Sequence, residues 1–184
     1  MDDVFEEDQF VARVAIAPVL ALDGARTSLR ELWRKGRTVT TFVRHFGCLF
    51  CHQAVDDLIA VVPRIHARGA RVVVVGNGSV EQAVRFYAEK ALPREGVDVV
   101  TDPEREVYRT ADFERGMARL LNGGARRAYR EARRDGHRVT GLFGDLTQLG
   151  GTMVTDPPPK LVYLHRSRFA GDHADLRDVL AALA

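Results

Sequence analysis

The feature that most constrains this chain is a pair of cysteines set between a strand-like and a helix-like segment. The only two cysteines, Cys48 and Cys51, form a C-x-x-C motif. The β-branched residues before them predict a buried strand over 39–43. After them, apolar residues recur at helical spacing, and Gly69 is expected to end that helix. These helical positions are Val55, Leu58, Ile59, Val62 and Ile65, with a kink expected at Pro63.

The pattern of strand and helix then repeats. Residues 71–76 and 97–100 are predicted as two further strands. Between them, a capping box at 79–82 is expected to start a helix. The predicted inner face of that helix comprises Val80, Ala83, Val84, Tyr87 and Ala91. Strands that alternate with helices in this way indicate a parallel sheet covered by helices.

The two ends of the chain and one insertion complete the predicted fold. An apolar stretch over 14–22 is interpreted as an N-terminal β extension, and a capping box at 28–31 is expected to start a short helix. Residues 112–136 are predicted to form a helical insertion, broken at 122–124 and ended by Gly136. Its polar helix carries Arg126, Arg127, Arg130, Arg133 and Arg134.

The C-terminal part is predicted to hold two antiparallel strands, over 152–155 and 161–165, joined by a proline-rich turn. A closing helix follows, with Leu176, Val179, Leu180 and Leu183 on its apolar face. The order of elements predicts an α/β fold, a thioredoxin-like three-layer α/β/α sandwich. We expect a single domain over 1–184, with its core over about 14–183.

Composition sets limits on the function. The chain of 184 residues has 27 basic and 25 acidic side chains, and this near balance does not indicate a nucleic-acid partner. No uncharged apolar run is long enough for a membrane span, so no membrane partner is expected. Residues 1–8 are acidic and unlike a secretory signal, which favours a cytoplasmic location. Because structural disulfides are rare there, catalytic cysteines are favoured.

The expected position of Cys48, at the N-terminus of a helix, favours its thiolate form, because unpaired N–H groups and the helix dipole stabilise an anion. Cys51 lies one turn further on, within reach of an adduct formed on Cys48. His52 and Arg44 are candidates for stabilising the thiolate or assisting proton transfer. The alternatives are a solvated helix residue for His52 and an exposed strand-end charge for Arg44. His45 is interpreted as a packing or solvent-facing residue.

Other uses of the cysteines stay open at this point. The string C-x-x-C-H also matches a haem c attachment motif, and zinc would need a further ligand such as His165 or His173. We expect neither a metal nor another cofactor. A redox-sensing or partner-binding module, docked through the arginine helix, and a protein-disulfide reductase are the alternatives to a peroxide-reducing enzyme.

Five stretches of the chain together resemble the AhpC/TSA-type peroxiredoxin-like proteins, and most closely the peroxiredoxin-like 2 group. The resemblance covers roughly residues 14–183. The stretches are 44–51, 75–79, 101–108, 148–152 and 165–173. Three features depart from patterns in related proteins: Thr41 and His45 replace a proline-and-threonine loop, Gly151 precedes Thr152 where a cis-proline is usual, and His52 replaces an arginine.

This resemblance implies a thioredoxin fold and an antioxidant or peroxide-reducing activity, with Cys48 and Cys51 as the redox pair. One branch of the group is a prostamide and prostaglandin F synthase, which reduces an endoperoxide. The expected function is therefore reduction of a peroxide or endoperoxide through a dithiol/disulfide cycle. The expected partners are that substrate and a thiol reductant such as thioredoxin, and a homodimer is an open alternative.

Overall fold

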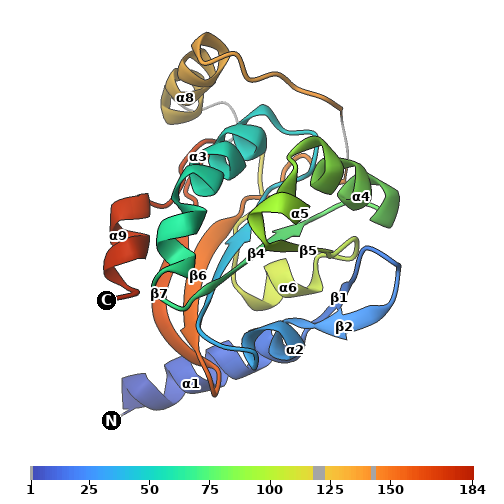
Figure 1. The fold of residues 1–184 in the computed structure, drawn as a ribbon. Helices are drawn as coiled ribbons and strands as arrows, with labels where there is room; N and C mark the ends of the chain where they lie inside the picture. Colours follow the sequence, from blue (N-terminus) through green and yellow to red (C-terminus); the bar gives the residue numbers. More distant parts are fainter. Residues whose placement is uncertain (1, 118–122, 142–143) are drawn as a thin grey trace.

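The computed structural model describes residues 2–117, 123–141 and 144–184, which form one seven-stranded sheet with helices on both faces (Figure 1). The strands are β1 (Pro18–Leu20), β2 (Arg26–Ser28), β3 (Thr38–Phe42), β4 (Arg71–Gly76), β5 (Val97–Thr101), β6 (Gly151–Asp156) and β7 (Lys160–Arg166). Their order across the sheet is β2-β1-β5-β4-β3-β6-β7. The central strands β3, β4 and β5 are parallel, whereas β1, β2, β6 and β7 pair with their neighbours in antiparallel fashion.

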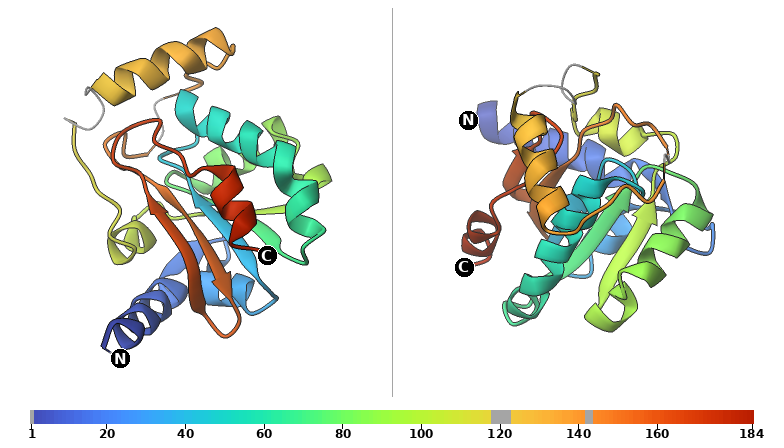
Figure 2. Two further views of the ribbon diagram at one scale, coloured as in Figure 1. Left: turned by 90° about the vertical axis from the view of Figure 1, so that its left-hand side faces the viewer. Right: turned by 90° about the horizontal axis from the view of Figure 1, so that it is seen from above.

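The helices form a layer on each side of this sheet (Figure 2). They are α1 (Asp2–Ile16), α2 (Leu29–Trp33), α3 (Leu49–His66), α4 (Val80–Glu89), α5 (Leu92–Glu95), α6 (Glu106–Thr110), α8 (Gly123–Arg134) and α9 (Leu176–Ala181). Side chains alternate along β4: Val72 and Val74 pack into one core with α3, α4 and α9, and Val73 and Val75 pack into the other with α1, α2 and α6. The predicted three-layer α/β/α sandwich is therefore confirmed.

The N-terminal prediction was partly wrong. Residues 14–16 belong to α1, and only the following hairpin of β1 and β2 forms the expected β extension. Val11, Val14 and Ala15 are fully buried at helical spacing, and they pack against the sheet through the second core. The helical period of these residues, continued back into the acidic segment, was the signal for α1.

The predicted inner face of α4 was also partly wrong. The capping box of Ser79 and Gln82 forms as expected, and Ala83 is buried. However, Val84 is 42% exposed, and Phe86 is buried in its place. The Phe86 ring lies 5.3 Å from the ring of Phe46, two residues before Cys48. The helix is thus oriented by aromatic packing under that motif rather than by its aliphatic residues.

Other local predictions are confirmed with small differences. Helix α2 begins after Ser28 as expected, but the Ser28 side chain makes no capping hydrogen bond. Helix α3 continues through Pro63 for one more turn. Helix α8 carries the predicted arginines and is followed by Gly136 at φ +86°, whereas residues 118–122 of the predicted insertion lie outside the described residues. Within the described part of the chain, no helix has the length and apolar character needed to cross a membrane.

Candidate active site

Cys48 occupies the N-cap position of α3, at the point where the chain leaves the end of β3. Its carbonyl accepts the backbone N–H groups of Cys51 and His52, both at 3.0 Å. Gly47 allows a close approach of another segment here, because a Cβ on Gly47 would lie 2.2 Å from the carbonyl oxygen of Gly141. Both cysteines are free thiols and are buried. The first turn of α3 therefore carries Cys48 at its positive end, with Cys51 one turn further on.

Arg44 brings a fixed positive charge to Cys48. Its Nη1 lies 3.3 Å from the Cys48 sulfur. The rest of its guanidinium donates to backbone carbonyls, with Nε at 3.0 Å from the oxygen of Gln148 and Nη2 on that of Leu146. The side chain is buried rather than exposed at a strand end. Because three groups hold the fork of Arg44, its charge stays directed at the sulfur.

His45, predicted as a packing or solvent-facing residue, is buried beside the cysteine turn. The residue is 4% exposed, and its Nδ1 is buried without a hydrogen-bond partner among the described residues. The His45 side chain contributes to the lowered pKa of the Cys48 thiol. Arg44 and His45 therefore both favour the thiolate form of Cys48.

The two thiols have opposite acidities. A hydrogen bond from the Cys51 thiol lowers the pKa of Cys48 well below its usual value, against the effect of burial, and His45 and Arg44 lower it further. Burial raises the pKa of Cys51 well above its usual value, and the neighbouring Cys48 raises it further. Deprotonation of the pair therefore begins at Cys48, while Cys51 keeps its proton.

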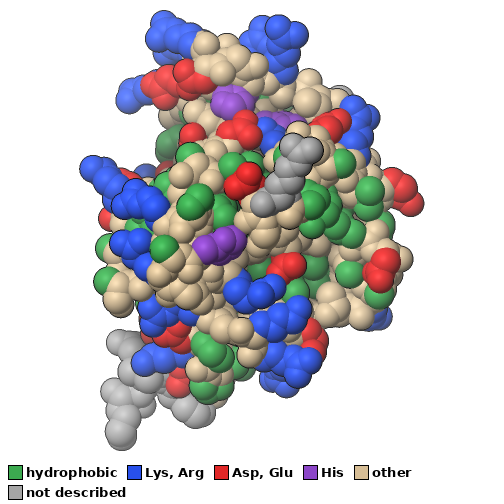
Figure 3. Space-filling model, in the orientation of Figure 1, with side chains coloured by type: hydrophobic (Ala, Val, Ile, Leu, Met, Phe, Trp, Pro, Cys, Tyr) green, Lys and Arg blue, Asp and Glu red, His purple; other side chains and the backbone are tan. Residues whose placement is uncertain are grey.

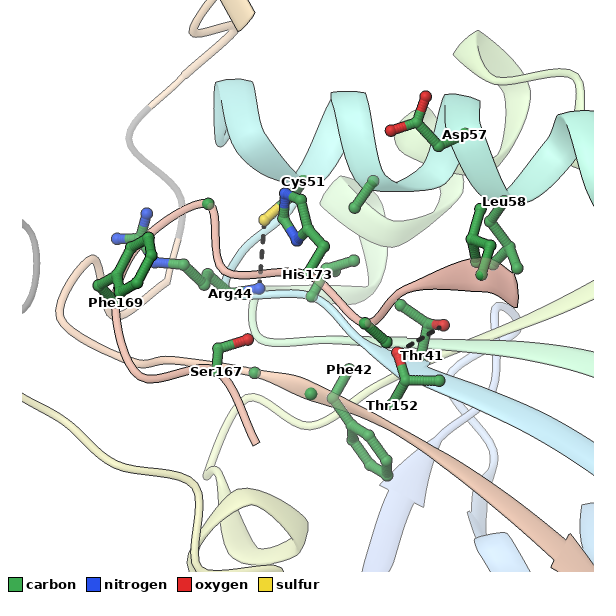
Figure 4. Close-up of a pocket in the computed structure, with 17 residues that line it drawn as sticks. Thr41, Phe42, Arg44, Cys51, Asp57, Leu58, Thr152, Ser167, Phe169 and His173 are labelled. Atoms are coloured by element: carbon green, nitrogen blue, oxygen red, sulfur yellow. Dashed lines mark hydrogen bonds between the residues drawn. The ribbon is translucent and has the colours of Figure 1, made fainter. Parts of the chain in front are cut away.

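Cys51 borders a cavity of about 60 Å³ between α3, the end of β3 and the segment 167–176 (Figure 4). The backbone N–H of Arg44 donates to the Cys51 sulfur at 3.2 Å. His173 lies next to this sulfur in Figure 4, and protein packed around its ring lowers its pKa, although the residue keeps contact with solvent. The other lining residues include Thr41, Ala54, Asp57, Leu58, Thr152, Ser167, Phe169, Ala174 and Leu176.

His52 is directed away from Cys48. Its Nε2 lies 3.0 Å from the hydroxyl oxygen of Thr140, and its ring lies 5.3 Å from the ring of Phe86. Burial, together with the charge of Lys90, lowers the pKa of His52, so the ring is neutral at neutral pH. Since Thr140 also donates its backbone N–H to the carbonyl of Gly47 at 3.1 Å, His52 helps to hold this segment over the cysteine turn.

A buried polar network holds the turn that leads from β3 into the cysteine motif. The Asn77 amide donates to the carbonyl of Arg44 at 2.6 Å and accepts the backbone N–H of Asp145 at 2.7 Å. Asp145 also pairs with both Arg105 and Arg115. Burial opposes ionisation of Asp145, but bonds from Thr147 and the Arg115 guanidinium lower its pKa to about 2. This network holds the 145–148 segment, whose carbonyls bind Arg44.

The residues weighed for the metal and haem alternatives have the following surroundings in the structure. No group of three His, Cys, Asp or Glu side chains that could hold a metal ion occurs among the residues the structure describes. His165, one of the two candidate zinc ligands, directs its Nε2 to the carbonyl of Asp172 at 3.2 Å. His173 lies near the cysteines, but as part of the cavity wall. Both thiols are buried, whereas haem attachment requires access to both.

Sequence reasoning gave no role beside the redox pair to several residues that surround the motif. They are His45, Asn77, Asp145, Gln148 and His173. His45 adjoins Arg44 at the strand end, so its position was a signal. The others follow strands or lie in loops far along the chain, and only the folded chain brings them to the cysteines.

Comparisons with known proteins agree with this architecture. The AhpC/TSA antioxidant enzyme model matches residues 57–168, which begin after both cysteines. Peroxiredoxin-like 2C of Homo sapiens is 34% identical over 92% of this chain and 78% of its own length. Prostamide/prostaglandin F synthase of Salmo salar is 27% identical over 94% of this chain and 90% of its own length.

Solved structures show the same fold at low sequence identity. Peroxiredoxin Q of Xanthomonas campestris has a TM-score of 0.63 and 21% identity, over 94% of this chain and 92% of that one. Peroxidoxin BcpB from Mycobacterium tuberculosis has a TM-score of 0.65 and 17% identity, over 92% and 93%. Together with the match to the family model and the 34% identical relative, these findings show that the chain belongs to the AhpC/TSA family of peroxiredoxin-like, thioredoxin-fold proteins.

Proposed function

We propose that this protein is a thiol-dependent oxidoreductase that reduces the O–O bond of a peroxide or endoperoxide through Cys48 and Cys51. The observation that carries this proposal is the surroundings of Cys48: its sulfur lies at the N-terminus of α3, 3.3 Å from a guanidinium nitrogen of Arg44. A helix N-terminus and a fixed cation both stabilise a thiolate, which is the nucleophilic form of cysteine.

With a hydroperoxide, the Cys48 thiolate attacks the terminal oxygen and the O–O bond breaks. The electron pair of that bond leaves with the alkoxide, which takes up a proton to become an alcohol, and Cys48 becomes a sulfenic acid. The Cys51 thiol then attacks the Cys48 sulfur. This step forms the disulfide and releases water, and two electrons have passed from the dithiol to the peroxide.

The same pair could reduce an endoperoxide, as the name of the Salmo salar relative suggests. The Cys48 thiolate would attack one oxygen of the endoperoxide, and the other oxygen would leave as an alkoxide. Cys51 would then displace the attacked oxygen from the Cys48 sulfur. A diol and a disulfide would result. In both cycles an external thiol restores the dithiol.

Arg44 and His45 are the best candidates for stabilising the leaving oxygen, because both face the Cys48 sulfur. Arg44 supplies a permanent positive charge with N–H donors, and His45 supplies an imidazole ring next to Arg44 in the chain. The sequence prediction that His52 transfers a proton stays a prediction. Its hydrogen bond to Thr140 favours a positioning role instead.

Burial of both sulfur atoms disfavours the protein-disulfide reductase alternative. Cys48 is 4% and Cys51 is 2% exposed, whereas exchange with a protein disulfide needs a sulfur that a large partner can reach. A hydroperoxide group is small enough to approach a recessed thiolate.

The test is to compare wild type with Cys48→Ser and Cys51→Ser after one equivalent of hydroperoxide. Wild type should lose two mass units as the disulfide forms. Cys51→Ser should stop at a sulfenic acid, which dimedone traps, and Cys48→Ser should react at least 1,000-fold more slowly. Undiminished peroxide consumption by Cys48→Ser would refute the proposal.

A further inference from the structure

The reductive half of this cycle depends on which sulfur an incoming thiol can reach. Cys51 lines the cavity of about 60 Å³, and Cys48 is not among the residues that form its wall. In Figure 4 the Cys51 sulfur lies beside the ring of His173. Among the described residues, the cavity therefore offers a path to one of the two sulfurs only.

The outer side of the cysteine turn, by contrast, is covered by the chain itself. Thr140 donates its N–H to the carbonyl of Gly47 at 3.1 Å, and a Cβ on Gly47 would lie 2.2 Å from the Gly141 oxygen. On the Cys48 sulfur itself, Arg44 already occupies one approach. A thiol that approaches from this side would meet the 140–141 segment, which contacts the turn at Gly47.

The chemistry of thiol–disulfide exchange selects the same sulfur. The attacking thiolate displaces one sulfur of the disulfide, and displacement is faster when the departing thiolate is the more stable one. Arg44 and the N-terminus of α3 stabilise a thiolate on Cys48. Attack on Cys51 therefore releases the better leaving group, whereas attack on Cys48 would release the poorer one.

We propose that a low-molecular-weight thiol enters this cavity and attacks the Cys51 sulfur of the oxidised protein, releasing Cys48 as the thiolate. The proposal rests on the Cys48–Cys51 disulfide of the proposed function. The incoming thiolate forms a mixed disulfide with Cys51 as the Cys48–Cys51 bond breaks. A second small thiolate then attacks the small-molecule sulfur of the mixed disulfide. The small-molecule disulfide leaves, Cys51 takes up a proton, and two electrons have entered the protein.

The size of the cavity favours a small reductant over a protein. About 60 Å³ is several times the 10–15 Å³ that one water needs by the same measure, which suits the CH₂–SH end of a small thiol. Cys51 itself is only 2% exposed, so a cysteine on the surface of a folded protein would not reach it.

The first experiment narrows the cavity. The disulfide is prepared with diamide, so the measurement does not depend on peroxide activity, and its reduction by 2-mercaptoethanol is followed by acid quench and intact mass. Ala54→Leu places a larger side chain in the cavity wall, and we expect reduction to slow at least tenfold. Ala60→Leu, an exposed position on the same helix, is the matched control and should reduce at the wild-type rate. Ala174→Leu narrows the cavity from the opposite wall if Ala54→Leu does not fold.

The second experiment locates the mixed disulfide. Wild-type disulfide mixed with excess 2-mercaptoethanol is quenched in acid within milliseconds, alkylated and mapped by peptide mass. The adduct should lie on Cys51, with Cys48 alkylated. An adduct on Cys48, an unchanged rate in both cavity variants, or faster reduction by thioredoxin than by an equal concentration of small thiol would overturn the inference. If peroxide leaves the dithiol intact while the diamide-formed disulfide is reduced through Cys51, the proposed function fails and the inference stands. Failure of diamide to form the disulfide would overturn both.

Discussion

Cys48 and Cys51 are separated by two residues, yet they have opposite surroundings. Cys48 is faced by the guanidinium of Arg44 and the ring of His45. Cys51 receives one backbone N–H and borders a cavity whose lining includes His173. The C-x-x-C spacing alone does not produce this difference. It arises because the strand end before the motif directs two polar side chains at the first sulfur only.

Removing the charge of Arg44 should have the largest effect on the difference in acidity between Cys48 and Cys51. In Arg44→Gln, we expect the pKa of Cys48 to rise, because the opposite charge that favours the thiolate is removed. Peroxide reduction at pH 7 should then fall at least tenfold. Thiolate absorbance at 240 nm against pH measures the pKa directly.

Two further arginine variants separate charge from geometry. Arg44→Lys keeps the charge but not the fork that binds two carbonyls, so it should recover only part of the lost acidity. Arg37→Gln removes an ion pair with Asp156 at the far end of β3 and should leave the Cys48 titration unchanged. A Cys48 pKa that stays low in Arg44→Gln would contradict the role given to this arginine.

A smaller effect should distinguish the two histidines that flank the motif. His45→Asn should slow peroxide reduction about tenfold and raise the pH at which iodoacetamide alkylates Cys48, because His45 acts on that sulfur. His52→Asn should change either measurement less than threefold, since the His52 ring binds Thr140. The reverse order would restore the proton-transfer role that the sequence predicted for His52.

The smallest expected effect concerns the support beneath Arg44. The folded pKa of Asp145, about 2, lies below the value of about 3.8 expected in the unfolded chain, so its ionisation stabilises the fold above pH 4. This contribution is lost as the pH falls from 4 to 2. We expect urea unfolding to show a loss of about 1–2 kcal/mol in wild type over this window, allowing for solvent screening. In Asp145→Asn, this loss in the free energy of unfolding between pH 4 and pH 2 should be smaller by the same amount. An equal pH dependence in both proteins would contradict the stabilising role given to the ionised Asp145.

The parts of the fold that follow from local pattern were accessible from the sequence. The β-branched runs at 39–43 and 71–76 predicted strands, and the apolar stripe after Cys51 predicted a helix, as the structure shows. These predictions succeed because the spacing of apolar residues follows which side of an element is buried. The hairpin after Gly151 was equally clear. Helix α1 was not predicted, because the apolar residues 14–22 were interpreted as part of a β extension. The helical period of the residues up to Ile16 was overlooked.

The site was accessible only where its residues adjoin the motif. Cys48, Cys51 and Arg44 were named from the sequence, and the structure brings these three together. The sequence favoured His52 as a partner of Cys48, and in the structure its ring bonds to Thr140, because helical spacing places residues on a face without fixing where a ring turns. Gln148 and His173 lie about 100 residues or more after the cysteine motif. Local sequence pattern does not show which distant segments come together.

The way in which Arg44 is held has a consequence for how this chain can vary. Its guanidinium is bound by the backbone oxygens of Leu146 and Gln148 and not by acidic side chains. Substitution of the residues that supply these oxygens leaves the oxygens in place, so the 146–148 loop tolerates changes of residue type that a carboxylate partner would not. The length of this loop, however, must be preserved. Inserting or deleting one amino acid there would move both carbonyl oxygens away from the arginine. The acidity of Cys48 would then change without any substitution near the motif itself.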